Sequence, residues 1–141
     1  MSTTLSATME FENIEKLKQF VEKRIAELSA ELGEVLRRID ALHGIVENKR
    51  RVFEALGLKF QDRGYEGIKL GGDITIMIDP PPDALVNIYE GISENLNKEL
   101  NAYRNLKNAL SKLPSSPELS ISATLVLDQN IPKHIVLKTV K

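Results

Sequence analysis

The stretch from Phe11 to Leu56 carries apolar residues at coiled-coil spacing, and this repeat constrains the fold more than any other feature. Its members follow one another at steps of three and four residues, and Lys49 fills one position of the stripe. The apolar members are Ile25, Leu28, Leu32, Val35, Ile39, Leu42, Val46, Phe53 and Leu56. A heptad repeat of this kind predicts one long amphipathic helix that packs its stripe against other helices.

The stripe continues upstream and is wider than a single seam. Ile14, Leu17 and Val21 extend it toward the N-terminus, with a stutter before Ile25 that locally unwinds a left-handed supercoil. Further apolar residues flank the seam at Leu36, Ile45 and Val52. A stripe of this width favours a bundle of three or more helices around the middle of the segment.

A second helix is predicted from Pro82 to Leu113, where apolar residues again step by three and four and Glu99 is the one polar seam position. Between the helices, apolar residues alternate on both sides of Gly71-Gly72, which predicts a β-hairpin at about residues 66–79. The proline run at residues 80–82 ends the hairpin, and Pro82 suits the first position of the helix.

In the C-terminal tail, from Leu119 on, apolar residues again alternate with other residues, as in the hairpin. Alternating apolar residues predict a strand from Leu119 to Leu127, residues 128–133 a turn, and His134 to Val140 a second strand. The predicted fold class is therefore mainly α with small β parts: a long antiparallel coiled-coil helical hairpin with a β-hairpin between the helices and a C-terminal β-hairpin. We expect a flexible N-terminus at residues 1–10, the helical hairpin at 11–113, and a C-terminal β segment for oligomerisation at 114–141.

The unequal helix lengths predict a homo-oligomer. A shorter second helix, folded back along the first, leaves the start of the first helix uncovered, and the tail strands present open edges that cannot reach the other hairpin. We expect Glu99 to face a second subunit or solvent. The residues expected at subunit contacts are Ile14, Leu17, Val21, Leu119, Ile121 and Leu125.

Composition narrows the class of protein. The 141 residues carry a formal net charge of −1, so bulk charge indicates no nucleic-acid partner. The chain has no cysteine, no stretch apolar enough to span a membrane, and no basic start followed by an apolar run as in secretory signals. These features predict a cytoplasmic protein. The lack of cysteine and tryptophan, with many Glu, Lys and Ile residues, is compatible with a thermophilic source.

No arrangement of residues indicates an enzyme, a cofactor or a metal. Asp40, His43 and Glu47 share one helical face, but carboxylate-bridged metal sites need matching motifs on further helices, and the second helix has no histidine. A solvated charged face is the better interpretation. Basic residues near the expected helix tip are candidate contacts for phosphate or an acidic partner: Lys49, Arg50, Arg51 and Arg63.

Three functions stay open. The first is a non-enzymatic oligomeric coiled-coil scaffold or adaptor that mediates protein–protein interaction. The second rests on a resemblance: the order long helix, β-hairpin, returning helix over Phe11 to Leu113 resembles the layout of prefoldin subunits, although this chain adds a β tail and shortens its second helix. That resemblance implies a molecular chaperone that holds unfolded clients. The third is a nucleic-acid-associated protein that uses the basic tip.

Overall fold

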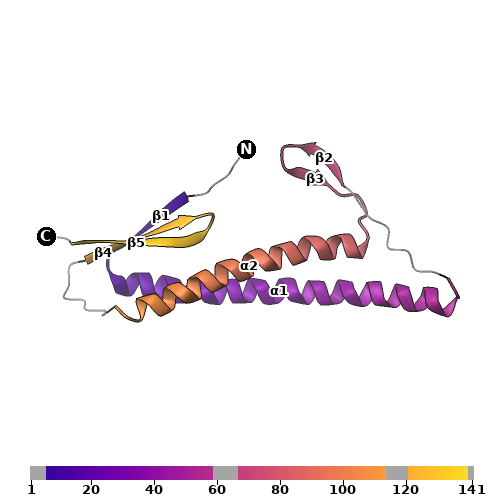
Figure 1. The fold of residues 1–141 in the computed structure, drawn as a ribbon, viewed down its shortest axis with the longest axis horizontal. Helices are drawn as coiled ribbons and strands as arrows, with labels where there is room; N and C mark the ends of the chain where they lie inside the picture. Colours follow the sequence, from indigo (N-terminus) through magenta and orange to yellow (C-terminus); the bar gives the residue numbers. More distant parts are fainter. Residues whose placement is uncertain (1–5, 59–66, 114–120, 140–141) are drawn as a thin grey trace. The chain divides into compact units, whose positions relative to one another are not determined.

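A computed structural model describes residues 6–58, 67–113 and 121–139 of the chain. These described residues are mainly helical (60%) and form two helices and two small antiparallel sheets (Figure 1). The helices are α1 (Ile14–Ala55) and α2 (Pro82–Leu110). Met1 aside, the chain divides into two compact units: a terminal unit of residues 2–32 and 95–141, and a central unit of residues 33–94. The predicted helical and β content is confirmed at this level.

Local signals explain where α1 begins and ends. The Asn13 side-chain oxygen accepts a hydrogen bond from the Lys16 backbone N–H at 2.8 Å, which caps the first turn. At the other end Gly57 has a φ of 71°, and its N–H donates to the Glu54 carbonyl at 3.0 Å. The Leu58 N–H donates to the Phe53 carbonyl at 2.8 Å, which completes a Schellman motif. The predicted stop at Gly57 is confirmed.

The start of α2 also follows its sequence signals. Pro82 is the first helical residue, where its missing N–H and fixed φ cost nothing, and Asp83 lies in the first turn beside the positive end of the helix dipole. The Ala84 and Leu85 N–H groups both donate to the Pro81 carbonyl. The α-helix ends at Leu110, three residues earlier than predicted, and the Leu113 N–H closes a final turn onto the Leu110 carbonyl.

The terminal unit contains a three-stranded antiparallel sheet in the order β1-β4-β5 (Figure 1). Its strands are β1 (Ser6–Phe11), β4 (Ile121–Asp128) and β5 (Ile131–Thr139). The predicted tail strands exist, but the turn between them is only Gln129 and Asn130, both with positive φ (52° and 66°). Two residues in the left-handed conformation form a tight turn that matches the twist of the strands. Strand β5 therefore begins within residues 128–133, which were expected to form the turn.

The expectation of a flexible N-terminus over residues 1–10 is wrong for residues 6–10, and residues 1–5 lie outside the described residues. Ser6–Phe11 forms strand β1, which pairs with β4 from Ser6 opposite Asp128 to Phe11 opposite Ala123. Met9 and Phe11 pack against the hydrophobic core. The Phe11 ring also lies 5.3 Å from the Phe20 ring of α1, centroid to centroid. The strand is stable here because β4 pairs with one of its edges and the core packs against one of its faces.

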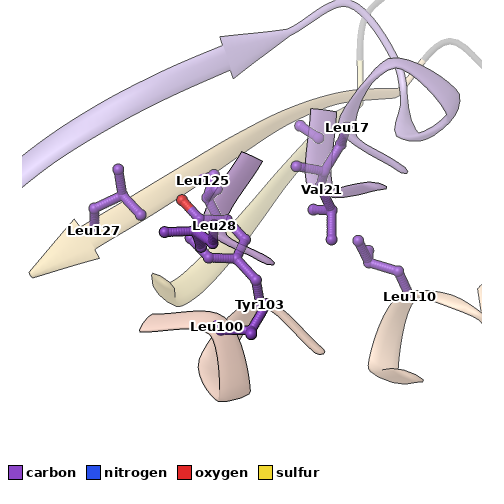
Figure 2. Packing of buried hydrophobic residues seen from close by; sticks show 9 residues of the cluster. Leu17, Val21, Leu28, Leu100, Tyr103, Leu110, Leu125 and Leu127 are labelled. Atoms are coloured by element: carbon purple, nitrogen blue, oxygen red, sulfur yellow. The ribbon is translucent and has the colours of Figure 1, made fainter. Parts of the chain in front are cut away.

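The hydrophobic core of the terminal unit joins both helices to the sheet. It is built of Leu17, Val21, Leu28, Leu100, Tyr103, Leu110, Ala123, Leu125 and Leu127. Figure 2 shows Leu28, Tyr103 and Leu125, from three different elements, gathered in one place. Along β4 the residues Ala123, Leu125 and Leu127 are buried, while the residues between them are only half-buried. One face of the sheet therefore covers the helices.

This core corrects the predicted subunit contacts. Ile14, Leu17 and Val21 are not left uncovered by α2, because all three are buried within the chain. Leu125 is likewise buried, Ile121 is half-buried, and Leu119 lies outside the described residues. The expectation failed because it counted only α2 as a cover for α1, whereas the sheet supplies a second one.

In the terminal unit the two helices run antiparallel and are tied by polar contacts. Lys18 Nζ donates to the Leu113 carbonyl at 2.9 Å, and Lys107 Nζ lies 3.6 Å from Glu22 Oε1. Arg24 Nη2 donates to Glu99 Oε1 at 2.9 Å. The expectation that Glu99 faces a second subunit or solvent is therefore wrong.

The Arg24–Glu99 pair is half-buried and electrostatically matched. Its side chains are 27% and 15% exposed. The hydrogen bond that Arg24 donates to Glu99 raises the pKa of Arg24 above its ordinary value. Burial of the neighbouring Tyr103 raises the pKa of that phenol. The pair occupies the polar position in the α2 seam, so a shifted helix register would leave two charges in a mainly apolar surrounding.

The sheet of the central unit is a separate two-stranded hairpin of β2 (Ile68–Gly71) and β3 (Ile74–Ile76). The predicted hairpin and its separation from the tail strands are confirmed. Its turn falls at Gly72-Asp73 rather than at Gly71-Gly72, because the pairing shifts between Lys69 and Gly71. Gly71 and Gly72 both have positive φ (148° and 58°), which explains the glycine pair.

Replacing Leu125 with alanine tests whether this core holds the terminal unit together. We expect the free energy of unfolding to fall by about 2–5 kcal/mol, because a fully buried leucine leaves a cavity. Leu137→Ala on the adjacent strand is the matched control, since that side chain is 43% exposed and should cost about 1 kcal/mol or less. Equal losses in urea unfolding would contradict the described core.

The Arg24–Glu99 pair can be tested by a double-mutant cycle. Glu99→Leu removes the carboxylate that accepts the Arg24 hydrogen bond and leaves Glu27, 3.8 Å away, as the remaining ion-pair partner, so it should cost about 1–3 kcal/mol of unfolding free energy. Adding Arg24→Met should recover most of that loss, because an apolar pair needs no partner charge. Glu94→Leu, at an exposed position of the same helix, is the control. A coupling energy near zero would show that the two side chains act independently.

Candidate interaction surface

Exposed large apolar side chains concentrate in the central unit. Of the fifteen such residues in the described part of the chain, thirteen lie between residues 33 and 94, and the other two are Val136 and Leu137. The thirteen are Leu36, Ile45, Val52, Phe53, Leu56, Leu58, Ile68, Leu70, Ile74, Ile76, Ile78, Ile88 and Ile92. The buried apolar residues of this unit are Ile39 and Val86. The central unit thus exposes large apolar side chains, whereas most of the large apolar side chains described for the terminal unit are buried or half-buried.

On α1 the predicted stripe divides into a covered seam and an exposed flank. Ile39 is buried and the seam residues Leu42 and Val46 are half-buried. The flanking residues Ile45 and Val52 are 46% and 55% exposed. Toward the end of the helix the seam itself becomes exposed at Phe53 and Leu56. The described residues of this chain therefore cover the seam of the α1 stripe as far as Val46 but leave its flank exposed.

A shallow concavity of about 300 Å³ lies on the exposed side of α1. It is lined by Ile45, Asn48, Lys49, Val52 and Phe53. Apolar side chains form most of its wall, and the polar residues Asn48 and Lys49 border it. A hollow of this composition suits an apolar side chain from another polypeptide better than a charged ligand.

α2 contributes fewer exposed apolar side chains to the central unit than α1 does. Ile88 and Ile92 are exposed on it, while Val86 is buried and Tyr89 half-buried. The Arg38 guanidinium of α1 lies 5.9 Å from the centroid of the Tyr89 ring, at cation–π distance. Arg38 also lies 4.0 Å from Glu34, so its charge is already partnered. The exposed part of α2 in this unit thus carries Ile88 and Ile92 beside the acidic residues Glu90 and Glu94.

The hairpin adds a second apolar face. Ile68 pairs directly with Ile76, so both side chains lie on the same side of the ribbon, and alternation places Ile74 there too. Ile68 and Ile74 are 61% and 66% exposed. The opposite side carries Lys69 and Thr75, which also pair with each other. The ribbon is amphipathic, yet its apolar face has no cover among the described residues.

The predicted basic contacts are only partly described. Lys49, Arg50 and Arg51 are exposed on the last turns of α1, whereas Arg63 lies outside the described residues. Arg51 Nε lies 3.9 Å from Glu47 Oε1 on the preceding turn. Asp40, His43 and Glu47 are exposed on the same helix. Within the described ranges, no group of three or more His, Cys, Asp or Glu residues is placed to hold a metal ion.

Neither α1 nor α2, as far as they are described, is apolar enough over sufficient length to cross a membrane. Comparisons of this chain with protein-family models, with curated proteins and with solved structures found no match. The candidate site is therefore defined by its own geometry, as an apolar surface of the central unit.

The hairpin that carries part of this surface depends on the glycine at position 67. A Cβ there would overlap the Thr75 Cγ2 atom and lie 2.9 Å from the Ile76 carbonyl oxygen. We expect Gly67→Ala to open the hairpin, which should appear as faster amide hydrogen exchange at Thr75 and Ile76. Gly33→Ala, where a Cβ meets nothing within 4 Å, should instead stabilise α1 by about 1 kcal/mol. Unchanged exchange in the Gly67 variant would contradict the described strand pairing.

Proposed function

We propose that the protein is a non-enzymatic, homo-oligomeric coiled-coil scaffold that assembles through its central unit. One observation carries the proposal: thirteen of the fifteen exposed large apolar side chains fall within residues 33–94. An exposed apolar surface of this extent marks an interaction site in a stable protein. The terminal unit has a core of its own, and among its described large apolar residues only Val136 and Leu137 are exposed.

The exposed area is large enough for a stable interface. A fully exposed leucine or isoleucine offers roughly 60–120 Å² of apolar surface, from about 1.5–3 kcal/mol at ~25 cal/mol per Å². The thirteen residues are between 36% and 67% exposed, so together they present on the order of 400–800 Å². A standard interface takes about 800 Å² per partner, of which roughly 60% is apolar. The central unit therefore supplies the apolar area that one partner needs.

The pattern on α1 favours other helices as the cover. Its exposed flank follows the heptad spacing, since Ile45 and Val52 are seven residues apart beside the seam of Leu42 and Val46. A helix with a covered seam and a second apolar line beside it fits a bundle of more than two helices. Further copies of α1 and α2 offer the same spacing and therefore suit this position. The predicted coiled-coil assembly is part of this proposal.

The hairpin supports the same conclusion. A two-stranded ribbon by itself is only marginally stable in water. This ribbon also exposes isoleucine side chains along one face. Packing that face against the hairpin of another copy removes those side chains from water without any additional component. A scaffold assembled through its central units leaves the terminal units as separately folded modules for partner proteins.

The native mass of the particle tests the scaffold. We expect multi-angle light scattering at micromolar concentration to give a multiple of the 15.8 kDa chain. Ile45→Glu with Val52→Glu should shift the particle toward a single chain, because burying two carboxylates in an apolar interface is costly.

The matched control is Arg37→Gln with Arg51→Gln. It changes the net charge by the same two units, at α1 side chains that are 74% and 73% exposed, and should keep the wild-type mass. A wild-type particle of 15.8 kDa at micromolar concentration would refute the scaffold.

The exposed hairpin face also favours a second candidate, a prefoldin-like chaperone that holds unfolded clients. Under this alternative the apolar surface binds a client rather than another copy. The full chain would then suppress aggregation of a heat-unfolded client, and Ile74→Asp with Ile76→Asp would remove the effect. Full suppression by a chain that stays monomeric would favour the chaperone over the scaffold.

The basic residues near the end of α1 support the third candidate, a nucleic-acid-associated protein. Such binding would weaken as salt rises and would be lost on replacing Arg50 and Arg51 with alanine. Because Glu47 pairs with Arg51 and Glu54 is also exposed nearby, the local charge is mixed. A gel shift on DNA or RNA that fades with salt would replace the scaffold by this function.

A further inference from the structure

The sheet of the terminal unit has two edge strands that differ in how they are protected. The strand order β1-β4-β5 places β4 in the centre, with both of its edges used. Among the described residues, no strand pairs with the outer edge of β1 or of β5. Open edges present backbone N–H and C=O groups that can pair with another chain, so natural sheets usually block them.

The edge strand β5 carries several of these blocking features. Pro132 has no N–H to donate, and Lys133 and Lys138 place positive charges along the strand. The pairing of β5 with β4 also shifts between Val126 and Leu127, which marks a bulge. A further strand would therefore pair poorly with β5.

The edge strand β1 has none of these features in Ser6–Phe11. It contains no proline and no lysine, and its register with β4 runs without a shift from Ser6 to Phe11. Its one charged residue is Glu10. Six regular residues with a free edge form a template for strand addition.

We propose that β1 pairs antiparallel with β1 of a second copy of this chain, about a two-fold axis at Met9, so that two three-stranded sheets become one of six strands. In this register Ala7 lies opposite Phe11 on the face that covers the helices. On the other face Thr8 lies opposite Glu10. Each contact occurs twice by symmetry, as in any isologous interface.

The residues of β1 complement their own copies in this register. A small side chain meets a large one on the inner face, and a neutral hydroxyl meets a carboxylate on the outer face, where the two can hydrogen-bond. An axis at Glu10 would instead place two carboxylates directly opposite each other, which is destabilising. Pairing of β1 with its own copy is therefore favoured in the register with the axis at Met9 over the register with the axis at Glu10.

This contact is separate from the proposed assembly of the central units, because it uses the terminal unit only. One pair of six-residue strands buries less than a standard interface of about 800 Å² per partner. We therefore expect a weak dimer, with a dissociation constant in roughly the micromolar to millimolar range when the contact acts alone.

Charge variants at Thr8 test the register. Thr8→Glu faces Glu10 of the partner and should weaken the dimer, whereas Thr8→Lys should strengthen it. Two symmetric cross-strand pairs predict changes of about two- to thirtyfold in the dissociation constant, measured by sedimentation equilibrium. Thr8→Glu with Glu10→Lys should strengthen the dimer as Thr8→Lys does, because it forms the same opposite-charge pair in the reverse order. The measurements are made on the full chain carrying Ile45→Glu and Val52→Glu, which weaken the other interface.

Val136→Glu and Val136→Lys are the matched controls. They make the same charge changes on the same side of the sheet, at an exposed position of β5, and should leave the dissociation constant unchanged. Equal effects at positions 8 and 136, or no difference between Thr8→Glu and Thr8→Lys, would overturn the proposal.

The lack of cysteine in the chain allows a second, independent test. A mixture of Thr8→Cys and Glu10→Cys chains should form mixed disulfide dimers faster than either chain alone, because opposite residues are about 5 Å apart and diagonal ones about 7–8 Å. Lys138→Cys on β5 should not cross-link. Absence of mixed dimers would overturn the β1 contact, whereas a monomeric wild-type chain that still cross-links at β1 at high concentration would refute only the central assembly.

Discussion

Burial of the apolar face of β4 against the helices is the interaction on which the described structure depends most. Leu125 meets residues from the start of α1 and the end of α2 in one core, so the first and last parts of the chain must come together before any of them is stable. That core fixes the antiparallel direction of the two helices within the terminal unit. It also gives strand β1 a surface on which Met9 and Phe11 can be covered.

The elements that could be predicted from the sequence are those with a local cause. Heptad spacing indicated both helices, Gly57 ends α1 through a Schellman motif, and Pro82 begins α2. The hairpin of the central unit followed from alternating residues around a glycine pair. In each case the deciding residues lie within a few positions of the feature that they determine.

The features that were missed all depend on distant residues. β1 has the alternation of a short strand, but its stability comes from β4, more than 100 residues later in the chain. For the same reason Ile14, Leu17 and Val21 were assigned to a partner subunit, although all three are buried within the chain and the latter two share a core with β4. The width of the stripe on α1 did indicate the exposed residues Leu36, Ile45 and Val52, because the number of apolar lines on a helix is a property of the helix alone.

The two proposed self-contacts depend on different physical forces, and this difference decides what they can do together. The surface of the central unit is apolar and non-directional, so its strength follows the area covered and its geometry depends on how helices pack. The edge of β1 is directional, because backbone hydrogen bonds fix its register and a single charge can shift its affinity. Contact at one site raises the effective concentration at the other, so a weak strand pairing gains strength in an assembled particle. Two different self-contacts on one chain link copies in series, and the series closes into a particle or continues as a filament according to the geometry of the two contacts.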